Sequence, residues 1–481
     1  MTVLQLLVDG IWRDGAGPEF TDVNPARPAQ AIATGGLAST GDVDAAVAAA
    51  RRAATGWGRT PYHERAAVLT RAAGLVAASA EQWGAELSGE EGKTRAEGIG
   101  EVRRAAEILR FCAGEADRDT GEVYSSPRRG ERILVVRRPI GVVAVITPFN
   151  FPIAIPAWKI APALVHGNVV VWKPASVVPL LAVRLASALH DAGLPAGVLN
   201  LLIADGRTGG YLISHPGVDA VTFTGSTEVG RSIATSCAAR GVAVQAEMGG
   251  KNAAVVLADA DLDLAVEQVL LGAFRSTGQK CTATSRLIVE APVADEFIGE
   301  VARRASALVV GDPLAEGTQM GPLVSDVALR TVLDGVGVAL AQGARLLAGG
   351  VGRLGGDLAE GWFAAPTVLE LASTDADLWR EELFGPVLGV VRADGAEAAF
   401  RLAADSAFGL AAAVFTNDLG RALAAVDELE VGILHINSET AGADPHVPFG
   451  GSKGSGYGPK EQGRASREFF THTTTVYVRG G

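Results

Sequence analysis

The chain has 481 residues, and 48% of them are hydrophobic. A chain of this length is too long for one compact core, so we expect two or three domains. Its formal net charge of -12 argues against nucleic acid or an anionic membrane as the main partner. An acidic small substrate is not excluded, because a local site can oppose the charge of the whole chain.

The cysteine count indicates the compartment. Cys112, Cys237 and Cys281 are too few for a disulfide framework, and an odd number suits a reducing environment. Residues 1–10 contain no basic region typical of a signal peptide. No apolar run is long enough to span a bilayer. We therefore predict a cytoplasmic protein that does not bind membranes.

The first part of the chain has the character of a scaffold. Residues 1–36 are expected to be irregular, with short strands and a turn at Asn24-Pro25. Helices are predicted from Asp42, as the cap, to about Arg52, from Pro61 towards Ala80, and from Thr94 to Ala116. We assign no chemistry to these helices and expect them only to pack.

Strands and helices then alternate. Residues 131–138 carry charges at alternate positions and predict an exposed strand or hairpin arm. The strands that follow are predicted at 141–146, 168–172, 198–203, 220–223 and 242–247, and the helices between them at 157–165, 179–192, 209–214 and 228–238. Because these strands are mostly apolar, the pattern predicts a parallel sheet covered on both faces, with ligands bound at the carboxyl ends of its strands.

A second alternation runs from Asn252 to about Asn437 and predicts a second α/β domain. Its strands include 253–257 and 285–290, its helices include 262–274 and 294–308, and residues 343–356 are expected to form a glycine-rich surface turn. The last segment, 469–478, is β-prone and is expected to pair with the arm at 131–138, within one subunit or across two.

Polar or special residues follow every strand of the first predicted sheet. They lie in the segments 147–152, 173–176, 205–210, 224–230 and 247–252. Their common place at one sheet edge predicts a dinucleotide site, although the fingerprint Gly-x-Gly-x-x-Gly is absent. Gly225-Ser226, at the start of a helix, can still offer backbone N–H groups and a hydroxyl to a pyrophosphate.

One cysteine stands in a loop. Cys281 follows the helix-like run 262–274 and precedes the strand-like run 286–290, and small residues such as Gly278 and Thr282 flank it. A lone cysteine is more often a buried structural residue, so the other motifs must decide its role. Cys112 and Cys237 have no motif and are taken as structural. The histidines show no metal spacing, and no metal site is predicted.

Seven motifs resemble those of the aldehyde dehydrogenase superfamily, in the order of that family and over nearly the whole chain. They are Thr147-Pro148-Phe149-Asn150-Phe151-Pro152, Lys173-Pro174-Ala175, Phe223-Thr224-Gly225-Ser226-Thr227, Glu247-Met248-Gly249-Gly250-Lys251-Asn252, Gly278-Gln279-Lys280-Cys281, Glu382-Leu383-Phe384-Gly385-Pro386-Val387 and Pro448-Phe449-Gly450-Gly451. Such a series is very specific.

The resemblance implies the fold and the assembly. The fold class is α/β, with a Rossmann-like parallel-sheet cofactor domain, an α/β catalytic domain and a small β oligomerisation element. The implied ranges are 1–122 and 142–250 for the dinucleotide-binding domain, 251–446 for the catalytic domain, and 123–141 with 463–481 for the oligomerisation element. A homodimer built by extending sheets between subunits is expected, and a homotetramer of two such dimers.

The resemblance also implies site residues. Cys281 would be the nucleophile, Glu247 the general base and Asn150 an oxyanion-hole donor, with Lys173 also in the catalytic set. Lys173 and Glu382 would hold the two ribose units of NAD or NADP. The full implied cofactor site is Ile146, Thr147, Pro148, Phe149, Lys173, Ser176, Gly206, Gly210, Phe223, Thr224, Gly225, Ser226, Val229, Glu247, Gly249, Glu382 and Phe384. The aromatic positions of the substrate tunnel would be Phe151, Trp158 and Phe449.

These residue types suit the oxidation of an aldehyde to a carboxylic acid. A thiolate attacks the aldehyde to give a thiohemiacetal, hydride leaves to the nicotinamide, and the resulting thioester is hydrolysed by a water that a carboxylate activates. Two alternatives from other classes stay open. One is a CoA-acylating dehydrogenase, which the presence of Glu247 disfavours. The other is a non-catalytic structural protein on this fold, which the intact set of Cys281, Glu247 and Asn150 disfavours.

The C-terminal run from His446 to Gly463 is similar to the α-ketoglutaric semialdehyde (2,5-dioxopentanoate) dehydrogenases, so that aldehyde is the expected substrate. Another aromatic or aliphatic aldehyde remains open. Glu439 and Pro445 depart from that branch, and Glu439 is expected to repel a carboxylate near the tunnel mouth. Succinic semialdehyde is less expected, because related enzymes often carry an arginine at the position of Trp158.

Ser176 bears on the choice of nicotinamide. NAD-preferring relatives often carry a glutamate there, which would repel a 2′-phosphate. Ser176 is small and neutral, and Lys173 and Arg207 supply positive charge at the same sheet edge. We therefore expect NADP to be accepted at least as well as NAD, within about tenfold.

Overall fold

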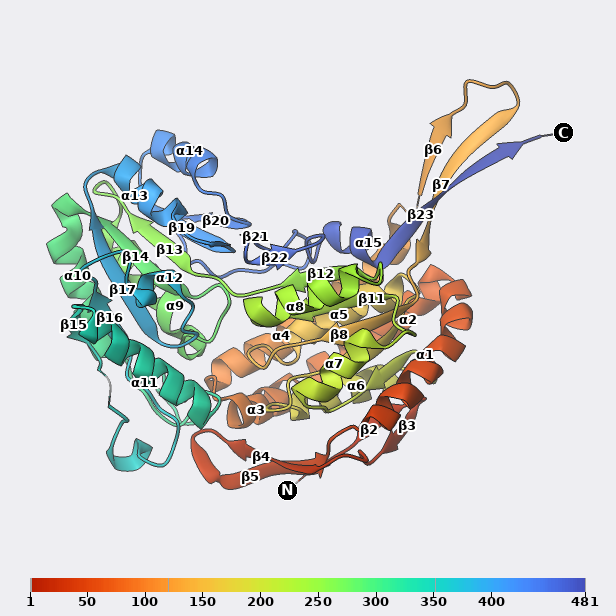
Figure 1. Ribbon diagram of the computed structural model, residues 1–481, viewed down its shortest axis with the longest axis horizontal. Helices are drawn as coiled ribbons and strands as arrows, with labels where there is room; N and C mark the ends of the chain where they lie inside the picture. Colours follow the sequence, from red (N-terminus) through yellow and green to blue (C-terminus); the bar gives the residue numbers. More distant parts are fainter. Residues whose placement is uncertain (1, 120, 351, 481) are drawn as a thin grey trace.

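The structure is a computed structural model that describes residues 2–119, 121–350 and 352–480. Figure 1 shows two α/β lobes, each built on its own sheet, and a slender arm that projects beyond them. The predicted fold class, α/β with sheets of mainly parallel strands, is confirmed. No helix in the described ranges is long and apolar enough to cross a bilayer.

The N-terminal region is more regular than expected. Its strands are β1 (Thr2–Leu4), β2 (Leu6–Val8), β3 (Ile11–Arg13), β4 (Glu19–Asn24) and β5 (Arg27–Gly36). β4 and β5 pair antiparallel around the predicted turn after Asn24, and β1 pairs with β5. β2 and β3 extend the first large sheet, so they are part of the core and not an irregular leader.

The helices that follow are α1 (Thr40–Arg59), α2 (Tyr62–Ala78), α3 (Ala80–Glu91) and α4 (Arg95–Ala113), with the 3-10 turn η1 (Gly114–Asp117). Asp42 is not the cap of α1: Ser39 is, and Asp42 completes the capping box from the third position. α3 was not predicted, because it lacks a strong apolar stripe and follows α2 without a loop.

The first large sheet has the order β22-β12-β11-β8-β9-β10-β2-β3. Its parallel strands are β8 (Val142–Ile146), β9 (Val169–Lys173), β10 (Leu199–Leu201), β11 (Ala220–Thr224) and β12 (Ala243–Glu247), and its helices are α5 (Ala154–Val165), α6 (Leu180–Asp191), α7 (Gly206–Ser214) and α8 (Thr227–Ala238). The expectation of a wholly parallel sheet is wrong at the edges, where β2 and β22 (Gly456–Tyr457) pair antiparallel.

The second sheet has the order β15-β16-β17-β14-β13-β19-β20. Its strands are β13 (Asn252–Val256), β14 (Thr284–Glu290), β15 (Arg345–Ala348), β16 (Thr367–Glu370), β17 (Val387–Ala393), β19 (Ala411–Phe415) and β20 (Ile433–Ile436). Its helical segments are α9 (Leu262–Phe274), η2 (Arg275–Gly278), α10 (Ala291–Ser306), α11 (Asp326–Ala341), η3 (Gly356–Leu358), α12 (Asp377–Arg380), α13 (Ala396–Ala404) and α14 (Leu419–Glu428).

One expectation for the second lobe needs correction. The glycine-rich segment 343–356 is not only a surface turn, because β15 lies inside it and pairs antiparallel with β16. Four residues lie outside the described ranges: Met1, Thr120, Val351 and Gly481. Val351 belongs to this glycine-rich segment, and Met1 and Gly481 are ends of the implied domain ranges. The successive residues of β13 pack alternately into two hydrophobic clusters, which confirms that both faces of this sheet are covered.

The arm consists of β6 (Gly121–Ser125), β7 (Glu131–Pro139) and β23 (Thr471–Arg479). β23 pairs antiparallel with β7 from Thr471 to Arg479, so the predicted pairing occurs within one chain. The expected strand starts too early: Phe469 and Phe470 end the helix α15 (Ala465–Phe470), because both rings are buried in the first core. The short strands β18 (Phe408–Gly409) and β21 (Ser452–Lys453) pair with each other.

Candidate active site

The loop that carries Cys281 is held in an unusual backbone conformation. Ser276, Thr277 and Gly278 have φ values of 52°, 55° and 66°, a region that favours glycine. A Cβ on Gly278 would lie 2.3 Å from the carbonyl oxygen of Gly385, so only glycine fits there. Strain of this kind persists only where surrounding contacts impose it.

Hydrogen bonds from distant parts of the chain supply those contacts. The Ser276 amide donates to Glu97 Oε1 at 2.8 Å, and the Val324 amide donates to Gln279 Oε1 at 3.0 Å. Asn252 Nδ2 donates to the carbonyl oxygen of Cys281 at 2.8 Å. The sulfur is therefore placed by contacts that the loop sequence alone does not reveal.

Cys281 itself is half-buried in the turn before β14. Burial, together with the nearby carboxylates of Glu382 and Glu247, raises the pKa of its thiol to about 12. The thiol is therefore protonated at neutral pH and needs a base to react. The effect of the two carboxylates shows that the fold gathers Cys281, Glu247 and Glu382 at one place.

Asn150 lies in the segment between β8 and α5 and is buried. Its Nδ2 donates to the carbonyl oxygen of Gln279 at 2.9 Å, two residues before Cys281. An amide nitrogen carries two N–H groups, so this bond leaves the second donor for another acceptor. The predicted oxyanion donor and the predicted nucleophile are thus neighbours.

Glu247 ends β12 and is buried, with Oε2 accepting from the Gly451 amide at 3.2 Å. Burial raises the pKa of Glu247 well above its ordinary value, and the charge of Glu461 adds to the rise. Lys159 and the Gly451 amide oppose it without cancelling it. A carboxyl with a pKa moved towards neutrality is suited to take and return protons.

Two residues beside Glu247 were not predicted from the sequence. Lys159, buried in α5, donates to Thr222 Oγ1 at 2.9 Å and to the Phe223 carbonyl oxygen at 3.1 Å, and it forms an ion pair with Glu461. Lys159 stands in an apolar run and Glu461 lies about 300 residues further along, so no local pattern joins them. Only their spatial position beside Glu247 shows that they influence it.

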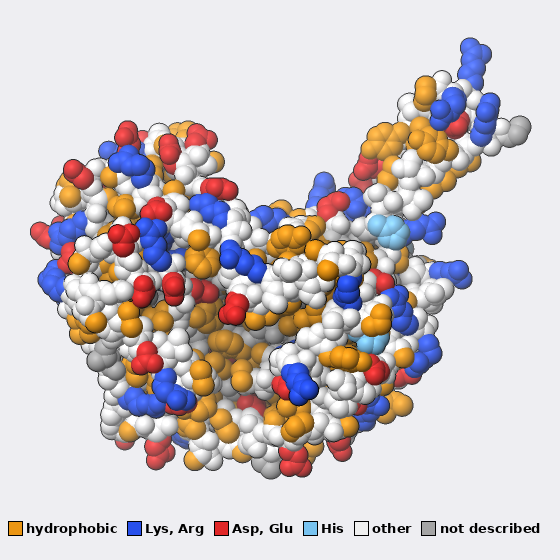
Figure 2. Space-filling view, in the orientation of Figure 1, with side chains coloured by type: hydrophobic (Ala, Val, Ile, Leu, Met, Phe, Trp, Pro, Cys, Tyr) orange, Lys and Arg blue, Asp and Glu red, His pale blue; other side chains and the backbone are white. Residues whose placement is uncertain are grey.

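The predicted cofactor residues meet at one edge of the first sheet. Strand register places Ile146 beside Lys173 and Phe223, and Thr224 beside Glu247. Thr147, Pro148 and Phe149 follow Ile146, Ser176 lies in the turn after β9, Gly206 and Gly210 lie in α7, and Gly225, Ser226 and Val229 lie at the start of α8. Beside α7 and α8 the surface is hollowed between the two lobes, with hydrophobic side chains in its depth (Figure 2).

Several features of this edge fit a dinucleotide. Ser226 caps α8, which leaves the N-terminal amides of that helix facing the edge. Thr224 Oγ1 is buried and has no hydrogen-bond partner in the part of the chain that the structure describes. Burial lowers the pKa of Lys173 to about 8, partly offset by Asp205. A polar atom without a partner and a desolvated amine are what a bound polar ligand would satisfy.

Glu382 and Phe384 approach this edge from the second lobe. Glu382 Oε1 accepts from the Gly250 amide at 2.9 Å, and a Cβ on Gly249 would lie 2.0 Å from Glu382 Oε2. Burial raises the pKa of Glu382 to about 7. Phe384 adopts φ 52°, and its ring meets that of Phe149 edge to face at 5.7 Å. The two lobes therefore touch through the residues that the motifs singled out.

A cavity of about 380 Å³ leads to Cys281. Phe151, Trp158 and Phe449 line it, with the rings of Trp158 and Phe449 5.5 Å apart. The expectation that Glu439 repels a carboxylate here needs correction. Glu439 lines the cavity but lies 3.2 Å from Arg275 and 3.6 Å from Lys280, so neighbouring cations compensate its charge.

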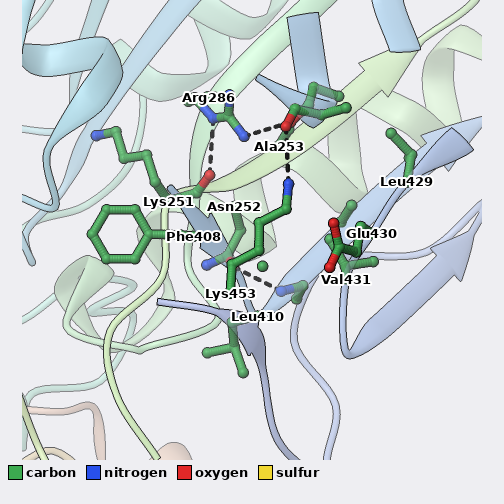
Figure 3. A pocket seen from close by; sticks show the side chains of 15 residues that line it. Lys251, Asn252, Ala253, Arg286, Phe408, Leu410, Leu429, Glu430, Val431 and Lys453 are labelled. Atoms are coloured by element: carbon green, nitrogen blue, oxygen red, sulfur yellow. Dashed lines mark hydrogen bonds between the residues drawn. The ribbon is translucent and has the colours of Figure 1, made fainter. Parts of the chain in front are cut away.

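A second, much smaller cavity lies behind Asn252 in the second lobe (Figure 3). Its volume is about 10 Å³, enough for one water and too small for a substrate. Arg286 donates to the Lys251 carbonyl oxygen at 2.8 Å and Lys453 to that of Ala404 at 3.1 Å, which closes the space. Neither Cys281 nor Glu247 lines it, and we assign it no part in the chemistry.

The model of the aldehyde dehydrogenase family matches residues 12–476 of the chain. The chain belongs to the aldehyde dehydrogenase family. The resemblance that the seven motifs indicated is thereby confirmed, and so is the predicted activity at the level of the family, NAD(P)-dependent oxidation of an aldehyde.

Individual members of this family are similar to the chain over nearly its full length. Alpha-ketoglutaric semialdehyde dehydrogenase of Bacillus subtilis is 41% identical over 98% of this chain and 97% of its own. 2,5-Dioxopentanoate dehydrogenase of Saccharolobus solfataricus is 38% identical over 97% of each chain. The crystal structure of betaine aldehyde dehydrogenase from Staphylococcus aureus in complex with NAD+ has a TM-score of 0.96 at 32% identity, covering 98% of this chain and 94% of that one. The fold of an aldehyde dehydrogenase is thus present over 98% of the chain.

Proposed function

We propose that this aldehyde dehydrogenase oxidises 2,5-dioxopentanoate to 2-oxoglutarate with NADP or NAD, through a thioester on Cys281. The observation that carries the proposal is that Cys281 lines a substrate-sized cavity while Asn150 is bonded to the loop of Cys281 and Glu247 lies near enough to influence the thiol. Relatives named for this aldehyde support the substrate. The compensated charge of Glu439 supports it too, because a substrate carboxylate would meet no free anion there.

The first proposed step forms a bond between Cys281 Sγ and the aldehyde carbon. The thiol proton must leave as the sulfur attacks, and a water in the cavity is the proposed acceptor, from which the proton passes to solvent. The carbonyl oxygen then becomes an oxyanion. The free N–H of Asn150 and the backbone amide of Cys281 would hold it; losing one such donor typically costs about 100- to 1000-fold in rate.

When bound, the nicotinamide supplies the hydride acceptor for the oxidation. Lys173 and Glu382 would hold its two ribose units, Ser226 and the first turn of α8 its pyrophosphate, and Phe384 would pack beside the nicotinamide ribose. Ser176, small and neutral, leaves room for the 2′-phosphate of NADP. The remaining members of the predicted cofactor site would line the same sheet edge.

The last proposed step is hydrolysis of the thioester by a water that Glu247 deprotonates. Because the pKa of Glu247 is raised, its carboxyl holds a proton at low pH and becomes a base as the pH rises towards its raised value. Lys159 and Glu461 lie behind Glu247 and are placed to adjust its charge. This step distinguishes an acid-forming enzyme from one that releases its acyl group to CoA.

We further propose the domain division given by the sequence, a cytoplasmic location and a homodimer or tetramer. Three free thiols support the location. The projecting arm supports an assembly, because most of β6 is exposed and its outer edge could pair with another chain (Figure 1). Light scattering at micromolar concentration tests this: a monomeric mass would contradict it.

The function is tested by steady-state NAD(P)H formation with 2,5-dioxopentanoate, succinic semialdehyde and betaine aldehyde, each with and without CoA. We expect the highest kcat/KM with 2,5-dioxopentanoate and no dependence on CoA. A higher kcat/KM with either other aldehyde would contradict the substrate, and a requirement for CoA would contradict the hydrolytic step.

A further inference from the structure

The start of α4 presents three charged side chains to the interior. Glu97 and Glu101 lie one turn apart on α4, and Lys93 comes just before Thr94, the cap of that helix. All three line the cavity that leads to Cys281. The side chain of Lys93 is fully buried and that of Glu101 is 2% exposed, so this charged row is not a solvated surface.

Lys93 and Glu101 hold the segment that carries Asn150. Lys93 Nζ donates to the Asn150 carbonyl oxygen at 2.7 Å and to Glu101 Oε2 at 2.5 Å, and it lies 4.3 Å from the centre of the Phe151 ring. Glu101 Oε1 accepts from the amides of Ile153 and Ala154 at 3.1 and 3.2 Å. The ion pair therefore forms hydrogen bonds at both ends of the turn that runs from Asn150 to the start of α5.

Glu97 holds the loop that carries Cys281. Its Oε2 accepts from the Thr94 amide at 2.9 Å, in the capping box of α4. Its Oε1 accepts from the Ser276 amide at 2.8 Å and from Ser276 Oγ at 3.3 Å, where the positive-φ run begins. One carboxylate thus joins the first turn of α4 to the strained approach to the nucleophile.

The charge of Lys93 is maintained. Burial alone would lower the pKa of Lys93, but the carboxylates of Glu101 and Glu91 raise it above its ordinary value, so the ammonium persists. Buried ion pairs are often replaceable by apolar side chains without loss of stability. A buried ion pair is therefore weak evidence for a role in stability, whereas the bonds of this row go to the two segments that form the reactive centre.

We propose that Lys93, Glu97 and Glu101 are positioning residues that fix the Asn150 amide relative to Cys281. This inference rests on the proposed function, in which Asn150 donates to the oxyanion. A displacement of about 1 Å between groups that act together can lower a rate by about 100-fold. The bond between Asn150 Nδ2 and the Gln279 carbonyl oxygen would transmit a shift of either segment to the other.

The test is a double-mutant cycle on the rate of the first NAD(P)H turnover, normalised to titrated active sites. The row is broken by Lys93→Met with Glu101→Gln, which removes the ion pair, keeps the side-chain lengths and leaves an acceptor for Ile153 and Ala154. We expect a fall of about 10- to 100-fold in the rate. In an Asn150→Ala background the same two changes should cost less than about threefold, because they would act through a group already lost.

Glu97 gives a second pair of variants. Glu97→Gln keeps an acceptor for the Ser276 amide and should retain the rate within about threefold, whereas Glu97→Ala should lose about tenfold. If the ion-pair variant does not fold, the two Glu97 variants still test the positioning role. Equal rates in the two Glu97 variants, or equal losses with and without Asn150, would overturn the inference.

Arg65→Met is the matched control. Arg65 is also a buried cation bound to backbone carbonyls, those of Val165 at 2.7 Å and Thr60 at 2.6 Å, but it lines no part of the cavity to Cys281. It should lower thermal stability and leave the normalised first-turnover rate unchanged within about twofold. If the row variants behave in the same way, their role is purely structural.

Hydrogen exchange separates this inference from the proposed function. Peptides covering residues 150–154 and 275–281 should exchange faster in the row variants and not in Arg65→Met, with or without turnover. A wild type that forms no NAD(P)H would contradict the function alone. Unchanged exchange in both segments would contradict the positioning role whatever the activity.

Discussion

The site around Cys281 has two sides, a sheet edge and a strained loop, here called its first and second wall, and they hold their residues in different ways. On the first wall, Lys173 and Glu247 end strands of one sheet, and strand register fixes them beside Ile146 and Thr224. On the second wall, Ser276, Thr277, Gly278 and Phe384 have positive φ values and are held by contacts from distant residues. A sheet edge places its residues through its own hydrogen-bond ladder, whereas a strained loop depends on its surroundings. Substitutions on the first wall should therefore alter the reacting groups themselves, whereas substitutions on the second wall should alter the backbone geometry that positions Cys281.

The largest effect is expected at the nucleophile itself. Cys281→Ala should lower kcat by several orders of magnitude, because no other group can form the thioester, while cofactor binding stays. Mass spectrometry should find an aldehyde-analogue adduct on Cys281. Cys112 and Cys237 serve as internal controls, since burial raises the pKa of both thiols. Activity retained in the alanine variant would refute the thioester route.

Glu247→Gln tests the chemical role of the first wall. Steady-state turnover should fall by about 100- to 10,000-fold, since general bases contribute about that much. A burst of roughly one NAD(P)H per active subunit should survive, because only hydrolysis is blocked. In the wild type, hydrolysis should speed up as the pH rises through the raised pKa of Glu247, and the variant should lose that dependence. Loss of the burst would assign Glu247 a further role in the first step.

Gly278→Ala tests the geometric role of the second wall. Its Cβ would meet the Gly385 carbonyl oxygen at 2.3 Å at a φ of 66°, so we expect the free energy of unfolding to fall by at least about 2 kcal/mol. Gly299→Ala, in the exposed middle of α10 with open space around it, is the control and should raise stability by up to about 1 kcal/mol. Denaturant unfolding measures both. Equal stabilities would mean that the loop relaxes around the methyl group.

Ser176→Glu should give the smallest effect, on cofactor choice alone. A carboxylate there would repel a 2′-phosphate by like charge, so the KM for NADP should rise about tenfold or more while that for NAD changes little. Initial rates with both cofactors measure the ratio. A wild type that uses NAD and shows no rate with NADP would mean that another group excludes the phosphate.

The contrast between the two walls also explains which site residues could be predicted from the sequence. Strand ends such as Lys173 and Glu247 follow from the alternation of apolar strands and helices, and the register of the sheet brings them together. The helix α4 was expected only to pack, yet Lys93, Glu97 and Glu101 contact both reactive segments. Their partners lie about 50 to 180 residues away, and no local periodicity encodes such contacts. Lys159 and Glu461 were missed for the same reason.

The high pKa of Cys281 has a consequence for survival under oxidative stress. Peroxides and soft electrophiles attack the thiolate, and a thiol with a pKa of about 12 is almost wholly protonated in the cell. Between turnovers the sulfur is therefore a poor target for conversion to sulfenic or sulfinic acid. The raised pKa values of the buried Cys112 and Cys237 extend this protection to every thiol of the chain. A resting thiol that stays protonated would thus limit the contact of such oxidants with the reactive form of the sulfur.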